Sequence, residues 1–204
     1  MLREAITMRL DQQLAEKWIK PHSRVLDLGC GDGELLAHMQ RKLHINGYGL
    51  EIDEDKITAA LGRGLNIIQQ DLNEGLGRFD DQSFDFVVMA QALQAVEAPD
   101  QLLLDMVRVG KQAIITFPNF AHWKTRSYLG IKGKMPVSDA LPYMWYDTPN
   151  IHLCTFRDFE ALCAANHIHI INRLAVNGDQ QGSFLMKHIP NLFGEIAIYR
   201  VSRT

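Results

Sequence analysis

The segment Asp27-Leu-Gly-Cys-Gly-Asp-Gly33 carries the residue types and spacing that most clearly indicate chemistry. Its glycines at positions 29, 31 and 33 lack a Cβ, so the backbone can turn sharply and approach a ligand closely. A helix beginning after this turn would offer its free N–H groups to the ligand. The spacing Gly-x-Gly-x-Gly is tighter than the Gly-x-Gly-x-x-Gly of dinucleotide sites, which accommodate a pyrophosphate. The segment therefore predicts a site for a nucleoside that carries an amino acid.

Two acids follow this loop at equal intervals. Glu51 lies 20 residues after Gly31, at the end of the second predicted strand, and Asp71 lies 20 residues after Glu51, behind the third. A carboxylate in the first position can accept both hydroxyls of a ribose, and one in the second can accept from an adenine amine. Taken singly, the glycines fit an ordinary turn and each acid fits a solvated strand end. Their order and spacing together favour one joint site at the carboxyl ends of parallel strands.

The segment 118–155 holds further candidates, which leave the catalytic residues unassigned. Tyr146 and His152 could line an acceptor pocket, with His152 as base and Tyr146 as orienter, and His122 follows the fifth strand toward the same cleft. The alternative, which we favour, is that the aromatic residues of this segment pack over the sheet. Asp147-Thr-Pro-Asn150 would then be a turn held by its own side chains.

The cysteines and histidines favour structural roles. Cys30 lies near a helix N-terminus, which could activate its thiol, but we favour a small residue that fits a tight turn. Three cysteines without a framework spacing favour a reducing compartment. Five residues later in the chain lack the paired short spacings of structural zinc sites, so we expect no metal: His152, Cys154, Cys163, His167 and His169.

Helices and strands alternate along the chain. Apolar periodicity predicts helices over 3–18, 33–43, 53–61, 100–108 and 156–166, and strands over 24–28, 46–50, 66–70, 83–89, 113–117, 168–176 and 195–201. Short apolar strands between helices are typical of a parallel sheet covered on both faces. The last two strands have no predicted helix between them. The sequence therefore predicts an α/β, Rossmann-like fold, with a mostly parallel sheet of about seven strands, an antiparallel edge hairpin and helices on both faces.

Length and composition are those of one domain. The 204 residues, 47% of them hydrophobic, can bury a core without disulfides or a metal. We expect a single domain over 1–204, with an N-terminal helix within 1–20 and a lid-like insertion over 118–155. The net charge of −3 and the lack of a basic stripe argue against nucleic acid. The N-terminal segment mixes acidic and apolar residues, which argues against a signal peptide or membrane span and favours the cytoplasm.

The ordered set VLDLGCGDG, GLEID, QQDLN and FDFVVM, within residues 24–117, resembles the class I S-adenosylmethionine (SAM)-dependent methyltransferase family. The resemblance implies a class I methyltransferase fold with SAM or S-adenosylhomocysteine (SAH) as cofactor. It would place Asp27 at the amino end of the methionine moiety, Glu51 at the ribose and Asp71 at the adenine. The remaining residues of the predicted cofactor site are Gly29, Cys30, Gly31, Gly33, Ile52, Leu72 and Gln91.

A narrower resemblance, over about residues 18–201, is to the MetW family of methionine-biosynthesis proteins. It rests on QALQAV at 91–96, FPNFAHW at 117–123, LPYMWYDTPNIHLCT at 141–155 and PNLF at 190–193. The family implies association with MetX homoserine O-acyltransferases and a helper role in acylating homoserine, the first committed step towards methionine. A partner protein of this kind should expose an apolar patch, for which 141–145 and 184–193 are the best candidates.

Three functions compete. We favour a SAM-binding protein that associates with and supports a homoserine O-acyltransferase. The alternative is an active SAM-dependent small-molecule methyltransferase; since methyl transfer can rest on positioning, the lack of an obvious base does not count against it. A nicotinamide-dependent reductase fits the loop spacing least. The sequence leaves open whether methyl transfer occurs, the acyl donor of the partner, the oligomeric state, and whether SAM occupancy regulates the partner.

Overall fold

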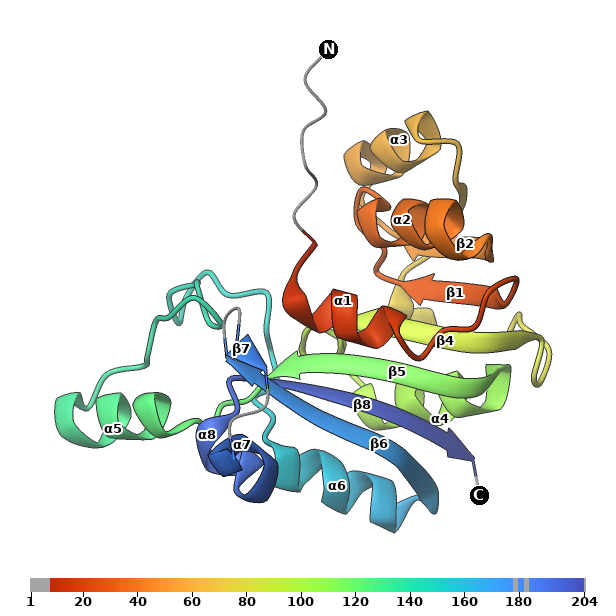
Figure 1. The fold of residues 1–204 in the computed structure, drawn as a ribbon. Helices are drawn as coiled ribbons and strands as arrows, with labels where there is room; N and C mark the ends of the chain where they lie inside the picture. The colour runs from red at the N-terminus through yellow and green to blue at the C-terminus, as the bar shows by residue number, and fades with distance from the viewer. Residues whose placement is uncertain (1–7, 178–179, 182–183, 204) are drawn as a thin grey trace.

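The computed structural model describes residues 8–177, 180–181 and 184–203 of the chain. An eight-stranded sheet runs through this part in the order β3-β2-β1-β4-β5-β8-β6-β7, with helices on both faces (Figure 1). The strands are β1 (Arg24–Leu28), β2 (Asn46–Glu51), β3 (Asn66–Gln69), β4 (Phe84–Ala90), β5 (Gly110–Pro118), β6 (Ile168–Asn177), β7 (Gln180–Gln181) and β8 (Ile196–Arg203). The helices are α1 (Leu10–Glu16), α2 (Glu34–Leu43), α3 (Glu54–Gly62), α4 (Pro99–Val109), α5 (Trp123–Lys132), α6 (Phe156–Ala165), α7 (Phe184–His188) and α8 (Pro190–Phe193), with single 3₁₀ turns η1 (Leu72–Glu74) and η2 (Leu93–Ala95).

The sheet is mostly parallel. β1 pairs in parallel with β2 and β4, β2 pairs with β3, and β4 pairs with β5. β8 runs antiparallel between β5 and β6, and β6 pairs antiparallel with the short β7. The predicted α/β, Rossmann-like sheet with an antiparallel pair at one edge is confirmed.

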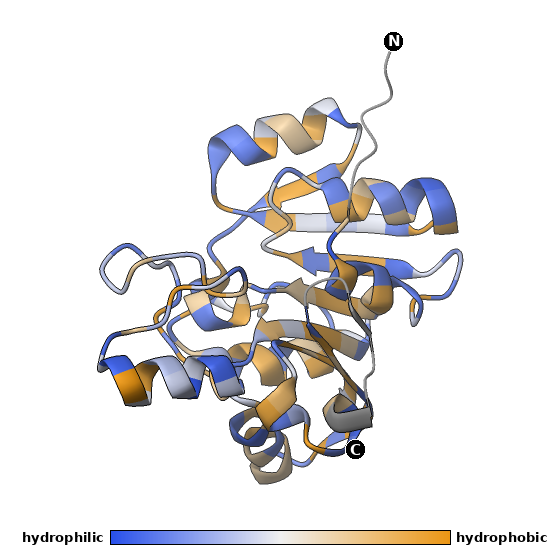
Figure 2. Cartoon of the chain, turned by 60° about the vertical axis from the view of Figure 1, so that its left-hand side comes forward, coloured by the Kyte–Doolittle hydropathy of each residue, from blue (hydrophilic) through white to orange (hydrophobic). Residues whose placement is uncertain are grey.

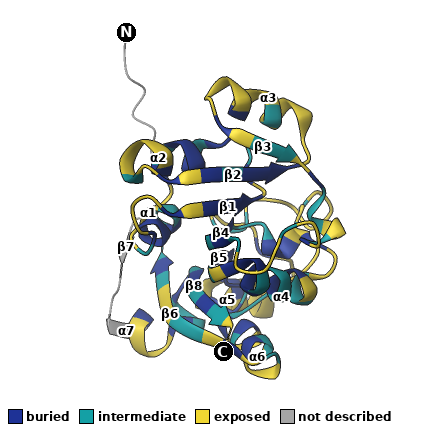
Figure 3. Ribbon diagram, turned by 90° about the vertical axis from the view of Figure 1, so that its right-hand side faces the viewer, coloured by how far each residue is buried: buried dark blue, intermediate teal, exposed yellow. Residues whose placement is uncertain are grey.

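Hydrophobic cores lie against both faces of the sheet. One core joins the strands to α4 and α6, through residues such as Leu103 and Phe159. The other joins the strands to α1, α2 and α3, through Ala15, Met39 and Ala60. Figure 2 shows hydrophobic residues gathered in the sheet and on helix faces that turn toward it, and Figure 3 shows the strands largely buried between the helical layers. The sheet is therefore a rigid platform for the loops at its ends.

The predicted N-terminal helix is only partly correct. Residues 3–7 of that prediction lie outside the described residues, and α1 ends at Glu16 rather than at Trp18. The backbone N–H groups of Lys17, Trp18 and Ile19 each donate to the carbonyl three residues earlier, so the helix tightens into a 3₁₀-type turn. The start of α3 agrees with its sequence, because Asp53 caps it by accepting from two backbone N–H groups.

The expectation that no helix separates the last two strands is wrong. α7 and α8 lie between β6 and β8, with Pro190 at the first helical turn of α8. Helices of five and four residues are too short to show an apolar period. The connection is therefore longer than a hairpin turn, although β6 and β8 are antiparallel neighbours.

One edge of the sheet collects the segments that matter for function. The loops after β1, β2, β3, β4 and β5 all leave from the carboxyl edge of the parallel strands, where such folds bind ligands. Because β8 is antiparallel, the chain enters it at this same edge. None of the helices in the described residues is long and apolar enough to cross a membrane.

Candidate functional site

The glycine loop between β1 and α2 is left-handed at each of its three glycines. Gly29, Gly31 and Gly33 have φ of +66°, +58° and +77°, values that side chains with a Cβ rarely adopt. A Cβ at Gly33 would collide with Leu65 and press on Ala60, so this glycine lets α2 pack closely. A Cβ at Gly31 would meet no heavy atom within 4 Å. Gly31 is therefore the position that keeps the backbone open to a ligand.

Glu51 holds the glycine loop against the end of β2. Its side chain is buried, and Oε2 accepts from the backbone N–H of Gly31 at 2.8 Å. Oε1 accepts from the N–H groups of Ile52 and Asp53 at 2.9 and 3.1 Å. Oε2 accepts only one of these bonds and has a second lone pair, so Glu51 can still accept from a ligand hydroxyl. This structural role was not expected from the sequence.

Asp27, at the end of β1, is a buried carboxylate with an unusual protonation equilibrium. Burial raises its pKa from 3.8 to about 7; the Arg9 guanidinium opposes this rise and the Glu51 carboxylate adds to it. Within the described residues, no side-chain hydrogen bond engages the Asp27 carboxylate. A carboxylate in this setting favours the arrival of a cation, which would restore its ionised form.

Cys30 has a packing role within the loop. Its sulfur lies where a Cβ on Gly49 would approach to 2.5 Å, so the side chain fills the space beside β2. Burial raises the pKa of the thiol to about 12, which keeps it protonated. The interpretation of Cys30 as a small residue in a tight turn agrees with this, and a reactive thiolate does not.

The remaining predicted cofactor residues surround the same edge. Asp71 lies shortly after β3, at the start of the turn η1, and its Oδ1 accepts from the backbone N–H of Asn73 at 2.9 Å. Leu72 lies beside the loop, because a Cβ on Gly29 would be 3.8 Å from its Cδ1. Ile52 is more than half exposed after β2. The structure thus brings the predicted residues to one edge, with Asp71 and Ile52 open to solvent or ligand.

Gln91 and α1 close this edge in a way that sequence reasoning missed. Gln91 has a φ of +60°, a strained conformation for a residue other than glycine. Its Nε2 donates to Asp11 Oδ2 at 3.2 Å, and the Thr116 hydroxyl donates to the same oxygen at 2.8 Å. Asp11 is almost fully buried, and Arg9 lies 3.3 Å from its other oxygen. We call this group, Asp11 with Gln91 and Thr116, the α1 tether.

The helical periodicity of the sequence indicates that Asp11 is buried. It lies three and four positions before Leu14 and Ala15, so it shares the buried face of α1 with them. A carboxylate on such a face must find buried donors.

Segment 118–155 forms a projecting arm, so the expectation that its aromatic residues pack over the sheet is wrong. It contains helix α5, which extends away from the sheet (Figure 1). Trp145 and Tyr146 are 71% and 68% exposed and contact each other edge to face. The chain returns at Ile151 and His152, whose backbone N–H groups donate to the Gln94 carbonyl. We call residues 123–153 the arm.

The three catalytic candidates are not gathered into one pocket. His122 is buried and lines a cavity that includes neither Tyr146 nor His152. Tyr146 is exposed on the arm. The His152 ring lies 3.2 Å from the carbonyl of Glu97, so as a donor it is already engaged. An acceptor pocket built from Tyr146 and His152 is therefore not supported.

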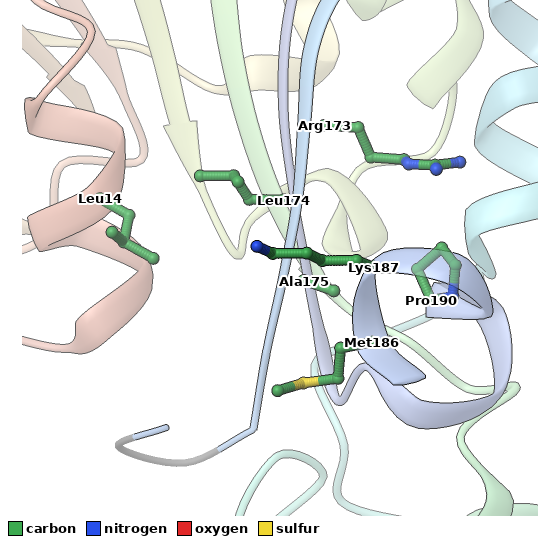
Figure 4. Close-up of a pocket in the computed structure, with 7 residues that line it drawn as sticks. All are labelled: Leu14, Arg173, Leu174, Ala175, Met186, Lys187 and Pro190. Atoms are coloured by element: carbon green, nitrogen blue, oxygen red, sulfur yellow. The ribbon is translucent and has the colours of Figure 1, made fainter. Parts of the chain in front are cut away.

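Another cavity, of about 360 Å³, lies between α1, β6 and α7. Figure 4 shows Leu14, Leu174, Met186 and Lys187 among the residues that line it. It shares no lining residue with the glycine loop. Among the residues that the structure describes, no group of three or more His, Cys, Asp or Glu side chains could hold a metal ion.

A family model for methionine biosynthesis protein MetW matches residues 9–201, nearly the whole chain. The chain belongs to the MetW family. It is 34% identical over 207 residues to the bifunctional methionine biosynthesis protein MetXA/MetW of Rhodopirellula baltica. This match covers 97% of the MetW chain but 33% of the relative, so the chain spans a third of that protein's length.

Two solved methyltransferase structures are similar in fold to this MetW chain. A SAM-dependent methyltransferase from Mesorhizobium loti aligns with a TM-score of 0.68 at 15% identity, covering 94% of this chain and 96% of that one. Magnesium protoporphyrin IX methyltransferase from Synechocystis, a structure with bound SAH, aligns with a TM-score of 0.66 at 18% identity, covering 95% and 83%. At these identities the likeness shows a shared fold.

Proposed function

We propose that this MetW chain binds SAM or SAH at its glycine loop, associates with a homoserine O-acyltransferase of the MetX type and supports its acylation reaction. The observation that carries the partner is the Rhodopirellula relative, whose name joins MetXA and MetW in one bifunctional protein. Fusion holds two units at a high effective concentration, which matters for units that must meet. The methionine-pathway family supports the same partner.

The residues at the carboxyl edge fit the proposed cofactor. The buried Asp27 carboxylate, with a pKa near 7, suits the ammonium of a methionine moiety. Glu51 has a free lone pair on Oε2 for a ribose hydroxyl, and Gly31 leaves open space beside the backbone. Asp71 follows the next strand, β3, at the start of the turn η1, where it can accept from an adenine amine. The cofactor supplies a methyl group on a positively charged sulfur, and these residues bind and orient it.

The arm supplies the proposed contact with the acyltransferase. Within the described residues, sixteen large apolar side chains are exposed, and twelve of them lie in the arm. Concentrations of exposed apolar side chains mark interaction surfaces. Trp145 and Tyr146 belong to the residue types that dominate binding energy at interfaces. Of the two patches predicted from the sequence, the arm includes 141–145.

The charge of the arm indicates the kind of surface that it would meet. The chain as a whole carries a net charge of −3, but the arm has more cations than carboxylates. An acidic rim around an apolar centre on the acyltransferase would complement it. The charged residues of the arm are Lys124, Arg126, Lys132, Lys134, Asp139 and Asp147.

Thermal unfolding tests the cofactor. SAM and SAH should raise the melting temperature and NADH should not; at a hundred times Kd a ligand adds about 2.7 kcal/mol of stability. Gly31→Ala should weaken this ligand-induced shift, because its Cβ enters the open space at the loop. Gly33→Ala, which collides with Leu65, should lower the melting temperature without ligand more than Gly31→Ala does. The absence of a shift with either nucleoside at millimolar concentration would disprove the assignment.

Co-purification tests the partner. Trp145→Ala and Tyr146→Ala should each weaken binding to the acyltransferase by at least about 2 kcal/mol if they lie at the centre of the contact. Leu61→Ala is a matched control, because Leu61 is an exposed apolar residue on α3, outside the arm. Homoserine acylation by the co-purified complex should fall with the same two variants.

Two results would change the proposal. If wild type neither binds the acyltransferase nor raises its acylation rate, the partner is wrong. If the purified chain alone transfers the methyl group of SAM to a small molecule of the methionine pathway, the methyltransferase alternative replaces the helper role.

A further inference from the structure

A second cavity lies beyond the exit of β5, between α5 and the start of β8. Its volume is about 230 Å³, and α5 and the start of β8 lie on the same side of the molecule (Figure 1). None of the predicted cofactor residues lines it. It is lined by Asn119, His122, Lys124, Thr125, Tyr128, Pro136, Val137, Ser138, Ala140, Leu141 and Glu195.

His122 is the buried polar group in this cavity. The residue is 3% exposed, and its Nε2 is buried without a hydrogen-bond partner. Native structures rarely leave such an atom unpaired, so it calls for a ligand or an ordered water. Its Nδ1 lies 4.0 Å from Glu195 Oε1. With the proton on Nε2, Nδ1 is free to accept a hydrogen bond beside that carboxylate.

Opposite charges face the cavity beside His122. Lys124 Nζ lies 3.6 Å from Glu195 Oε1, and the lysine side chain is 65% exposed, so it can move toward a ligand. Burial lowers the pKa of His122, with Lys124 adding to the effect and Glu195 opposing it, so the ring is neutral at pH 7. The cavity therefore offers one cation, Lys124, and one carboxylate, Glu195, so the side chains that line it carry no net charge.

Hydrogen bonds hold the wall of the cavity that is formed by the end of β5 and the start of β8. The Asn119 side chain donates to the backbone carbonyls of Asn191 and Gly194, and the Asn119 N–H donates to the Glu195 carbonyl at 2.7 Å. These bonds fix the start of β8 next to the exit of β5. Glu195 is therefore held in place, while Lys124 adjusts from α5.

Apart from the hydroxyl residues Thr125 and Ser138, the rest of the lining is mostly apolar, and the cavity volume limits the size of the ligand. Tyr128, Val137 and Leu141 form that side of the cavity. Sites for drug-sized ligands start at about 300 Å³, so this one suits a smaller molecule. A ligand that matches the cavity is small, carries one cation and one anion close together, and has a short apolar side chain.

We propose that this cavity binds a neutral, zwitterionic α-amino acid with a short apolar side chain. Its ammonium lies between Glu195 Oε1 and His122 Nδ1, which are 4.0 Å apart, its carboxylate meets Lys124, and its side chain contacts Val137 and Leu141. This site goes beyond the proposed function, because neither the glycine loop nor the aromatic pair Trp145 and Tyr146 lines it.

Calorimetric titration with L-methionine tests the site in the presence of saturating SAH. SAH fills the methionine subsite of the glycine loop, so any further binding of the amino acid occurs elsewhere. Two analogues test the contribution of each charged group: 4-(methylthio)butanoate lacks the ammonium, and 3-(methylthio)propylamine lacks the carboxylate. We expect saturable binding of L-methionine, and at least about tenfold weaker binding of each analogue, because hydrogen bonds to charged groups contribute at least that much.

Three variants locate the binding. Lys124→Met, Glu195→Gln and His122→Phe should each weaken L-methionine binding by at least about tenfold. Lys124→Met changes a mostly exposed side chain, so it keeps the test valid if the buried His122→Phe fails to fold. Lys187→Met is the matched control, because Lys187 lines the other cavity (Figure 4); it should bind L-methionine as wild type does.

The outcomes separate this site from the proposed function. No saturable binding of L-methionine, an analogue that binds as tightly as L-methionine, or variants that bind like wild type would each overturn the amino-acid site. If SAH itself does not bind, the cofactor assignment fails instead. The titration on the protein alone then still tests the cavity, because its variants lie outside the glycine loop.

Discussion

At the scale of single residues, Asp27 makes a prediction about pH. Its folded-state pKa of about 7 lies above the ordinary 3.8, so the folded state holds the proton more tightly than the unfolded state. The free energy of unfolding should therefore fall by roughly 3–4 kcal/mol as the pH rises from about 4 to about 7. Asp27→Asn cannot ionise and should be more stable than wild type at pH 8. Urea unfolding at pH 5 and pH 8 measures the difference.

Asp85 provides a control of opposite sign. Hydrogen bonds from Lys111 and from the backbone N–H of Arg24 lower the pKa of its carboxyl. Its ionised form therefore stabilises the protein at neutral pH, and this contribution is lost as the pH falls through the folded-state pKa. Asp85→Asn should be less stable than wild type at pH 8. If both Asn variants shift stability in the same direction there, burial does not explain the raised pKa of Asp27.

Residue spacing predicted which side chains reach the carboxyl edge, but not what those side chains do there. The alternation of elements is enough to bring Asp27 and Glu51 to the ends of adjacent strands. The three backbone N–H groups that Glu51 accepts depend on how the glycine loop folds back, which no local pattern encodes. A Glu51→Ala variant would consequently lose loop structure together with any ribose contact.

At the scale of elements, the α1 tether predicts coupled stability effects. Asp11→Ala leaves the Thr116 hydroxyl and the Gln91 amide without their buried acceptor, which should cost about 1–3 kcal/mol. Thr116→Val removes one of these donors. The double variant should therefore be less destabilised than the sum of the singles, by at least about 0.5 kcal/mol. Denaturant unfolding of the four proteins measures this coupling.

A second cycle checks that the coupling is specific. Thr58 lies on the exposed face of α3, where its hydroxyl donates to the Glu54 carbonyl. Thr58→Val combined with Asp11→Ala should be additive, because the two residues share no partner. Strict additivity of Asp11→Ala with Thr116→Val would instead mean that α1 is held by its apolar packing alone.

The elements best predicted from the sequence are those whose packing repeats along the chain. β1 was predicted at its observed bounds because Val25, Leu26 and Leu28 form a short apolar segment that is buried between the helical layers. α5 was missed because it projects from the sheet and buries little beyond Thr125, so no apolar stripe marks it. The same lack of a packed face leaves Trp145 exposed, where aromatic content alone suggested a covered lid.

At the scale of the whole molecule, the proposed partnership predicts that a covalent link between the two proteins compensates for a weakened contact between them. Joining the acyltransferase to this chain through a flexible linker should restore acylation to the Trp145→Ala variant, because the second binding step becomes intramolecular. Acylation by the separate proteins should fall on dilution, whereas acylation by the fused protein should not. If fusion leaves the Trp145→Ala defect unchanged, that side chain contributes something other than affinity.

The antiparallel course of β8 has a practical consequence for how the molecule can be handled. The strand starts at the edge that carries the glycine loop and the arm, so it ends at the opposite edge of the sheet (Figure 1). A sensor surface or fluorophore attached behind Arg203 therefore sits a full strand length from both proposed binding regions. Immobilised in that orientation, the protein presents its nucleoside site, its arm and its second cavity to bulk solution together.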